Sequence, residues 1–190
     1  MLTLSIIIGL IVAIALYIIS LYNGLVDKKA RTEEAWSGIE VQLKRRHNLI
    51  PNLIETVKGY ASHEQSTFER VVNARNSAIQ ASDASTTTTT AQAETVLSGA
   101  LRQLFALAED YPDLKANTNF LDLQEQLKEL EDQIQMARRF YNGSARDLNI
   151  MVDSFPSNLV ATRFNFVKFE FFELDESEAS EVKKVPSVKF

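Results

Sequence analysis

Two histidines, His47 and His63, are the residues of this 190-residue chain best suited to proton transfer or metal binding near neutral pH. They lie sixteen positions apart, which on one continuous helix places them about 160° apart around the axis, too far to share a metal ion. If the chain reverses near Gly59, the sequence leaves their separation open. The His63-Glu64 pair lacks the second histidine of an HExxH zinc helix. We therefore predict that both are surface or capping residues.

A denser set of polar side chains lies in MARRFYNGSARDLN, residues 136–149. Arg139, Asn142 and Arg146 follow one another at spacings of three and four, so they share one face of a helix. One hypothesis is an anion or partner site built on guanidinium groups. The hypothesis that we favour is a polar layer that bonds to a facing helix and fixes its register. The candidates for this layer are Arg46, Glu55, Arg138, Arg139, Asn142, Arg146, Asp147 and Asn149.

No catalytic motif accompanies these residues. The sequence has no GxSxG elbow, no phosphate-binding loop and no glycine-rich dinucleotide turn, and it holds six glycines. The absence of cysteine excludes disulfides, thiolate metal sites and cysteine nucleophiles. A net charge of -5 argues against a nucleic-acid partner. We therefore predict a protein that is not an enzyme and that uses no cofactor.

The elements that position these residues begin with an apolar helix. Residues 2–21 carry no charge, and twenty residues in a helix span about 30 Å, the thickness of a bilayer's hydrocarbon core. A cleaved signal peptide is the alternative, but no basic residue precedes the run and no small-x-small site follows it. Lys28, Lys29 and Arg31 follow the run, which predicts a cytoplasmic body and an N-terminus outside. We expect a single-pass cell-membrane anchor over residues 1–25.

The next region, residues 26–172, predicts an all-α fold, because its apolar side chains alternate at spacings of three and four. The preferred arrangement is an up-down antiparallel bundle of four helices, at residues 26–58, 63–80, 92–111 and 117–155. Gly59 would end the first helix, and Ser62 with Gln65 would cap the second. The alternative has three helices, with a long kinked first helix and a last helix broken at Gly143.

Several local signals should interrupt these helices. Pro51 removes a backbone hydrogen bond inside the first helix, so a kink is expected there. The threonine-rich residues 82–92 are predicted to form an exposed loop, because threonine is a poor helix former. Pro156 should end the last long helix. Residues 173–190 lack periodicity and predict a disordered tail.

A cluster of aromatic residues precedes that tail. RFNFVKFEFF, residues 163–172, holds the five candidate contact residues Phe164, Phe166, Phe169, Phe171 and Phe172. They could cover the end of their own bundle, dock on a second subunit, or enter the headgroup region beside the anchor. We expect them to contribute to subunit contact or to apposition with the membrane.

Several stretches of the sequence are similar to those of a known protein family. They are YNGLVDKKARTEEAWSGIEVQLKRRHNLIPNLIETVKGYASHE, the ARN of residues 74–76, and ARRFYNGSARDLN followed by SFPSN and FFE. Together they cover roughly residues 22–173, and they resemble the LemA family of bacterial membrane-anchored proteins. The resemblance implies an N-terminal membrane helix, an up-down helical bundle and no established catalytic activity.

These observations lead to two functional hypotheses. The first is a membrane-anchored scaffold whose bundle associates with proteins, most of all with further copies of itself, and with the lipid bilayer. The alternative is a bundle whose polar residues 138–149 bind an anion, a lipid headgroup or a metal between helices. The first predicts self-assembly that does not depend on the arginines, and the second predicts ligand binding that does.

Overall fold

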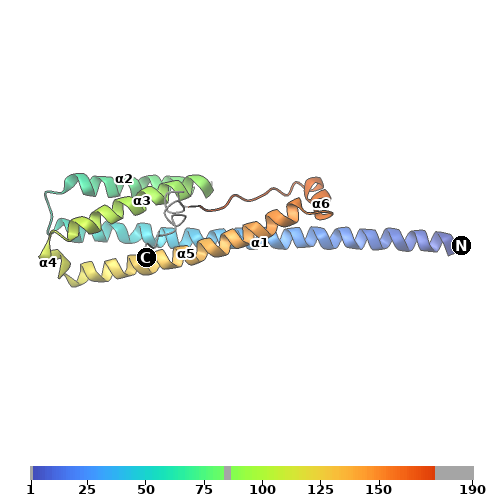
Figure 1. Cartoon of the computed structure of the whole chain (residues 1–190), viewed down its shortest axis with the longest axis horizontal. Coiled ribbons are helices and arrows are strands. Elements are labelled where there is room, and N and C mark those ends of the chain that lie inside the picture. Colours follow the sequence, from blue (N-terminus) through green and yellow to red (C-terminus); the bar gives the residue numbers. More distant parts are fainter. Residues whose placement is uncertain (1, 84–86, 174–190) are drawn as a thin grey trace, which may run out of the picture. The chain divides into compact units, whose positions relative to one another are not determined.

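The computed structural model describes residues 2–83 and 87–173, and within these ranges it contains helices and no β-strand (Figure 1). The helices are α1 (Leu2–Lys58), α2 (Gln65–Asp83), α3 (Thr87–Ala108), α4 (Pro112–Lys115), α5 (Thr118–Asp153) and α6 (Ser157–Arg163). The chain divides into two compact units, residues 1–38 with 137–170 and residues 39–136 with 171–190. α1 and α5 contribute to both units. The predicted all-α fold is confirmed.

The unit built from residues 39–136 is an antiparallel helical bundle. The ammonium group of Lys58 lies 5.7 Å from the centre of the Phe68 ring, and Arg75 Nε donates to the carbonyl oxygen of His47 at 2.7 Å. α2 therefore runs back along α1. Since α1 ends at Lys58, directly before Gly59, the predicted reversal is confirmed and the continuous first helix is wrong.

A single apolar core holds this bundle together. It contains side chains from α1, α2, α3 and α5, because the apolar residues of each helix recur on one face. α3 and α5 also meet through the rings of Phe105 and Phe120, whose centres lie 6.2 Å apart. The stripe predicted for α3 is confirmed, since Leu97, Leu101 and Leu104 are buried.

The turn between α1 and α2 differs in detail from the sequence prediction. α2 begins at Gln65, three residues after the exposed Ser62, so the predicted capping box is wrong. The backbone N–H groups of Thr67 and Phe68 donate to the carbonyl oxygen of Glu64, which opens the helix. The Glu64 carboxylate also accepts a hydrogen bond from Tyr111 at 3.3 Å. This contact from another part of the chain helps to fix where the helix starts.

The predicted loop over residues 82–92 is wrong for residues 82–83, which end α2, and for residues 87–92, which form the first turns of α3. Thr90 and Ala91 are buried, and the Thr90 hydroxyl donates to the carbonyl oxygen of Ala81 at 3.1 Å. Burial against α2 outweighs the weak helix propensity of threonine, which amounts to less than about 1 kcal/mol per residue. Residues 84–86 lie outside the described part of the chain.

The other expected interruptions have mixed outcomes. α1 continues as a helix through Pro51, and the expected kink there stays a prediction. α5 continues through Gly143, so the proposed break there is wrong. α5 ends at Asp153, shortly before Pro156, as predicted. The predicted tail lies almost wholly in residues 174–190, outside the described residues.

In the unit of residues 1–38 and 137–170, α1 packs antiparallel to the end of α5. Lys28 Nζ lies 2.9 Å from the Asp147 carboxylate, and the rings of Trp36 and Tyr141 lie 5.3 Å apart. At the start of α1, residues 2–20 are all exposed. By length and composition α1 can cross a membrane, with a mean hydropathy of 2.8 in its most apolar window. These properties are those expected of a membrane anchor.

Candidate functional site

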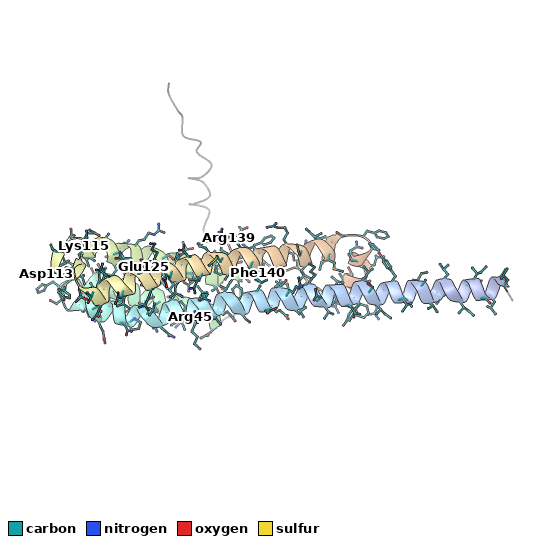
Figure 2. The ribbon with its side chains drawn as sticks, turned by 90° about the horizontal axis from the view of Figure 1, so that it is seen from below. Arg45, Asp113, Lys115, Glu125, Arg139 and Phe140 are labelled. Atoms are coloured by element: carbon teal, nitrogen blue, oxygen red, sulfur yellow. The ribbon has the colours of Figure 1, made fainter. Side chains whose placement is uncertain are left out.

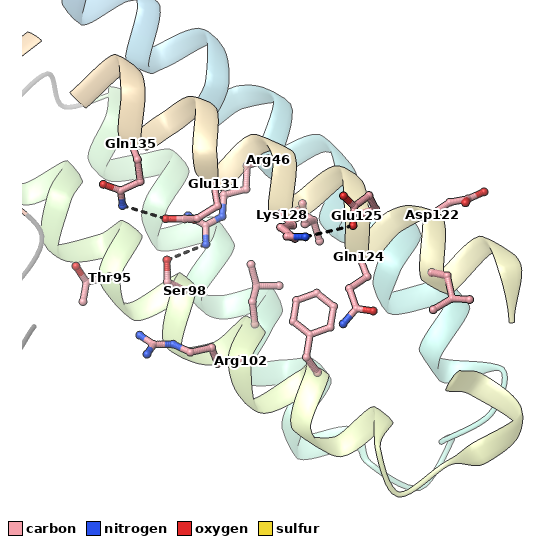
Figure 3. Close-up of a pocket in the computed structure, with 14 residues that line it drawn as sticks. Arg46, Thr95, Ser98, Arg102, Asp122, Gln124, Glu125, Lys128, Glu131 and Gln135 are labelled. Carbon is pink, nitrogen blue, oxygen red and sulfur yellow. Dashed lines mark hydrogen bonds and ion pairs between the residues drawn. The ribbon is translucent and has the colours of Figure 1, made fainter. Parts of the chain in front are cut away.

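The bundle of residues 39–136 contains a groove of about 970 Å³ between α3 and α5 (Figure 3). Its apolar lining consists of Leu101, Phe105, Leu121 and Leu127. Its polar lining consists of Arg46, Thr95, Ser98, Arg102, Asp122, Gln124, Glu125, Lys128, Glu131 and Gln135. Apolar side chains with a polar surround are typical of a site that binds another molecule.

The spacing of residues along the two helices creates this groove. Ser98, Leu101 and Phe105 recur at intervals of three and four, so they share one face of α3. Residues 121–135 of α5 supply the facing wall. Leu121 on that wall keeps 46% of its surface exposed, although its neighbours Phe120 and Leu127 on α5 are buried in the core. The groove therefore presents apolar surface that the bundle itself does not cover.

The base of the groove is a buried guanidinium group. Arg46 Nη1 lies 3.4 Å from a carboxylate oxygen of Glu94 and 3.4 Å from one of Glu131, while Nη2 donates to Ser98 Oγ at 2.7 Å. The Arg46 and Glu94 side chains are almost fully buried, whereas Glu131 is 41% exposed. A buried charge requires such partners, because its desolvation costs several kcal/mol. Arg46 thus joins α1, α3 and α5.

His47 extends this network. Its Nε2 lies 2.6 Å from the second carboxylate oxygen of Glu94. The prediction that His47 is a surface residue is wrong, because α1 packs against α2 and α3 and buries two neighbouring positions, Arg46 and His47. His63 is exposed, as predicted. Across residues 2–83 and 87–173, no group of three or more His, Asp or Glu side chains is arranged to hold a metal ion.

Glu94 is the residue that sequence reasoning missed. It stands three positions before Leu97 and seven before Leu101, so it continues the apolar stripe of α3 with a carboxylate. An acidic residue on a buried stripe indicates a buried ion pair, and Arg46 occupies the corresponding place on the stripe of α1. Each of the two residues is a charged residue in an otherwise apolar stripe. This feature of the sequence could have predicted that they form an ion pair.

The structure distributes the predicted polar layer over several environments. Arg46 bonds to Glu94, Ser98 and Glu131, and Glu55 is exposed on α1. Along α5, Arg138 and Asn142 are half-buried, while Arg139 and Arg146 are exposed. Asp147 pairs with Lys28, and that hydrogen bond lowers the pKa of the Asp147 carboxyl below its ordinary value. Asn149 bonds to the backbone of Phe169 through both of its amide atoms.

A second cavity, of about 590 Å³, lies beside these residues in the unit of residues 1–38 and 137–170. Its lining consists of Lys28, Arg31, Glu34, Arg139, Phe140, Gly143, Ser144 and Asp147. Figure 2 shows Arg139 and Phe140 on α5, and both side chains are exposed. Three cations and the two carboxylates of Glu34 and Asp147 line this cavity, so one positive charge is in excess there, which favours an anion.

The five phenylalanines lie in different surroundings. The rings of Phe164 and Phe166 contact Tyr22, and Phe169 packs on the neighbouring apolar cluster. Phe171 is partly exposed and Phe172 is fully buried. The first three therefore cover part of their own unit. Contact of the cluster with a second subunit or with lipid stays a prediction.

Comparison with known proteins identifies the family. Residues 35–190 match the LemA family model. Magnetosome protein MamQ 2 of Paramagnetospirillum magneticum is 25% identical in an alignment 186 positions long, gaps included, that covers 86% of this chain and 68% of that protein. Protein LemA of Metamycoplasma hominis is 28% identical over 162 residues, which cover 84% of this chain and 72% of that protein. Since the family model matches most of its length, the chain belongs to the LemA family.

Proposed function

We propose that this LemA family member is a membrane-anchored, non-catalytic interaction protein whose groove between α3 and α5 binds an amphipathic helix from a second copy of the chain. The observation that carries the proposal is the groove itself, which leaves the apolar side chain of Leu121 exposed between two polar walls. The apolar N-terminal part of α1 supports anchoring. The names of its relatives add no catalytic role.

The dimensions of the groove suit a helix. The lining residues extend over eleven positions of α3 and fifteen positions of α5, which span about 15 and 21 Å at the helical rise. Three to four turns of an amphipathic helix fit such a length, and apolar lining side chains bordered by polar ones are the chemistry of helix-in-groove recognition. Anchoring confines all copies to one surface, which raises their effective concentration and favours self-association.

A second copy offers a matching face on α5. The side chain of Phe140 is 62% exposed on α5. Arg139 lies next to Phe140 and complements the acidic groove residues Glu125 and Glu131. Because the groove and the α5 face are different surfaces, such a contact is head-to-tail and builds rings or filaments.

Replacement of Leu121 by aspartate should weaken self-association at least about tenfold, or roughly 1.4 kcal/mol, because it places a charge on the apolar groove wall. Analytical ultracentrifugation of the full-length protein in mild detergent, over a range of concentrations, measures the effect. Val41→Asp is the matched control, since Val41 is 51% exposed on α1 and does not line the groove. Wild-type protein that remains monomeric, or Leu121→Asp that associates normally, contradicts the proposal.

The cavity beside Arg139 favours a second candidate function, the binding of phosphate or of a phospholipid headgroup by Lys28, Arg31 and Arg139. Inorganic phosphate should then raise the melting temperature of the wild type, and Arg139→Ala should abolish the increase. Arg45→Ala is the control, because Arg45 is an exposed arginine of α1 outside this cavity (Figure 2). Equal phosphate responses in the two variants would rule out this function.

A further inference from the structure

α6 and the segment that follows it pack against α1 directly beyond its apolar run. The ring of Tyr22 on α1 lies 4.8 Å from the ring of Phe164, centre to centre. Leu25 of α1 is fully buried in a cluster that includes Val160 of α6. All of these residues belong to the same unit. α6 therefore lies beside the first turns of α1 that follow Leu21.

This position corresponds to the headgroup layer of a bilayer if α1 is the proposed membrane anchor. Residues 2–21 fill about 30 Å of hydrocarbon, and the headgroup layer adds about 5–7 Å on each side. Residues 22–26 rise about 7 Å along a helix. When α1 crosses close to the bilayer normal, these residues lie within the headgroup layer. α6, which contacts them, then lies at the same depth.

The outer surface at this depth is apolar and cationic. Phe155 is 80% exposed, Leu159 is 62% exposed and Val167 is 69% exposed. Arg163 follows Leu159 by one helical turn and Lys168 follows Val167, and both basic side chains are exposed. The Lys168 ammonium group also lies 3.1 Å from the exposed Asp153 carboxylate, so on binding it would exchange this surface ion pair for a lipid phosphate. Several exposed large apolar side chains within one short segment indicate a contact site. Aromatic and aliphatic side chains together with basic ones are typical of proteins that lie at the lipid–water boundary.

Hydrogen bonds hold this surface in place. The Asn149 side-chain amide donates to the carbonyl oxygen of Phe169 and accepts from its N–H, both at 2.9 Å. The buried Ser157 hydroxyl donates to the carbonyl oxygens of Met151 at 2.7 Å and Ser154 at 2.9 Å. Because the segment is ordered by its own unit, less conformational entropy is lost when it binds another surface.

We infer that residues 155–169, which include α6, form a second membrane contact, which docks on the headgroup layer of an anionic bilayer beside the anchor. Phe155, Leu159 and Val167 enter the boundary between headgroups and acyl chains, while Arg163 and Lys168 bind lipid phosphate. Lipid is the partner that the position favours, because this surface continues directly from the apolar run of α1 and combines apolar with basic side chains.

Environment-sensitive labels test this inference in the full-length protein, which has no native cysteine to interfere. Leu159→Cys and Val167→Cys carry a fluorescent label in vesicles of phosphatidylcholine and phosphatidylglycerol that contain a spin-labelled lipid. We expect both labels to shift to the blue and to lose most of their fluorescence to a quencher near the headgroups. Val41→Cys, an exposed position of the bundle, should be unaffected. Ile11→Cys reports on the anchor with a quencher deep in the acyl chains.

The outcomes separate the inference from its premise. If Ile11→Cys is quenched while the labels at positions 159 and 167 behave like that at 41, the anchor inserts and the second contact is wrong. If these two labels shift to the blue but lipid does not quench them, the surface contacts protein, which also overturns the inference. If Ile11→Cys is not quenched, the proposed anchoring itself fails. Loss of quenching in vesicles of phosphatidylcholine alone supports the role of the basic side chains.

Discussion

Replacement of Glu94 by alanine should cost the helical bundle about 3–5 kcal/mol of unfolding free energy, because it leaves the buried Arg46 guanidinium with one partly exposed carboxylate. His47 also loses the carboxylate oxygen that lies 2.6 Å from its Nε2. Chemical denaturation of the full-length protein in mild detergent, followed by far-ultraviolet circular dichroism, measures the loss.

A double-mutant cycle shows whether the ion pair itself is responsible. Arg46→Met combined with Glu94→Leu removes both charges and keeps a comparable side-chain volume. The double variant should therefore lose far less unfolding free energy than the sum of the losses of Arg46→Met and Glu94→Leu alone. Glu131 is partly exposed and can remain hydrated when Arg46 is absent. Additive losses, or a Glu94→Ala variant as stable as the wild type, would show that the pair does not govern stability.

Replacement of Tyr141 by alanine should be equally severe in the other unit, at about 3–5 kcal/mol, because it opens a cavity beside Trp36. Tyr141 is 1% exposed, and its hydroxyl donates to the carbonyl oxygen of Glu170 at 2.8 Å. Trp36 is the one tryptophan of the chain, so its fluorescence reports on unfolding at this place.

Tyr141→Phe separates the ring from the hydroxyl. It keeps the packing against Trp36 and removes one hydrogen bond, so it should cost only about 1 kcal/mol. The same fluorescence-detected denaturation compares the two variants. Equal losses for alanine and phenylalanine would assign the stability to the hydroxyl and contradict the packing explanation.

Much of the fold can be predicted from patterns among residues that are close in sequence. The apolar stripe of α1 and the glycine after Lys58 favoured the first helix of the bundle and the reversal that follows it over the three-helix alternative, and the structure confirms that preference. The end of α5 before Pro156 likewise depends on the conformation of a single residue. Each of these features is decided by residues close in sequence, so spacing and composition are enough.

The features that escaped prediction depend on residues far apart in the chain. Residues 87–92 are helical because Thr90 and Ala91 meet α2, and no local propensity contains that contact. Arg46 was assigned to a polar layer, but its partners Glu94, Ser98 and Glu131 lie 48 or more positions away. A single sequence shows that such a side chain is charged, but it does not show which distant residue is its partner. The candidate groove could not be predicted, because these distant contacts form it.

The unequal burial of the two carboxylates on Arg46 has a consequence for any helix that enters the groove. Glu131 lines the groove and is partly exposed, whereas Glu94 is enclosed. A basic side chain on the bound helix can form an ion pair with Glu131, while Arg46 remains paired with Glu94. One ion pair is then exchanged for another, so the electrostatic free energy of binding opposes the bound helix only weakly. The shape of that helix therefore decides which partner binds.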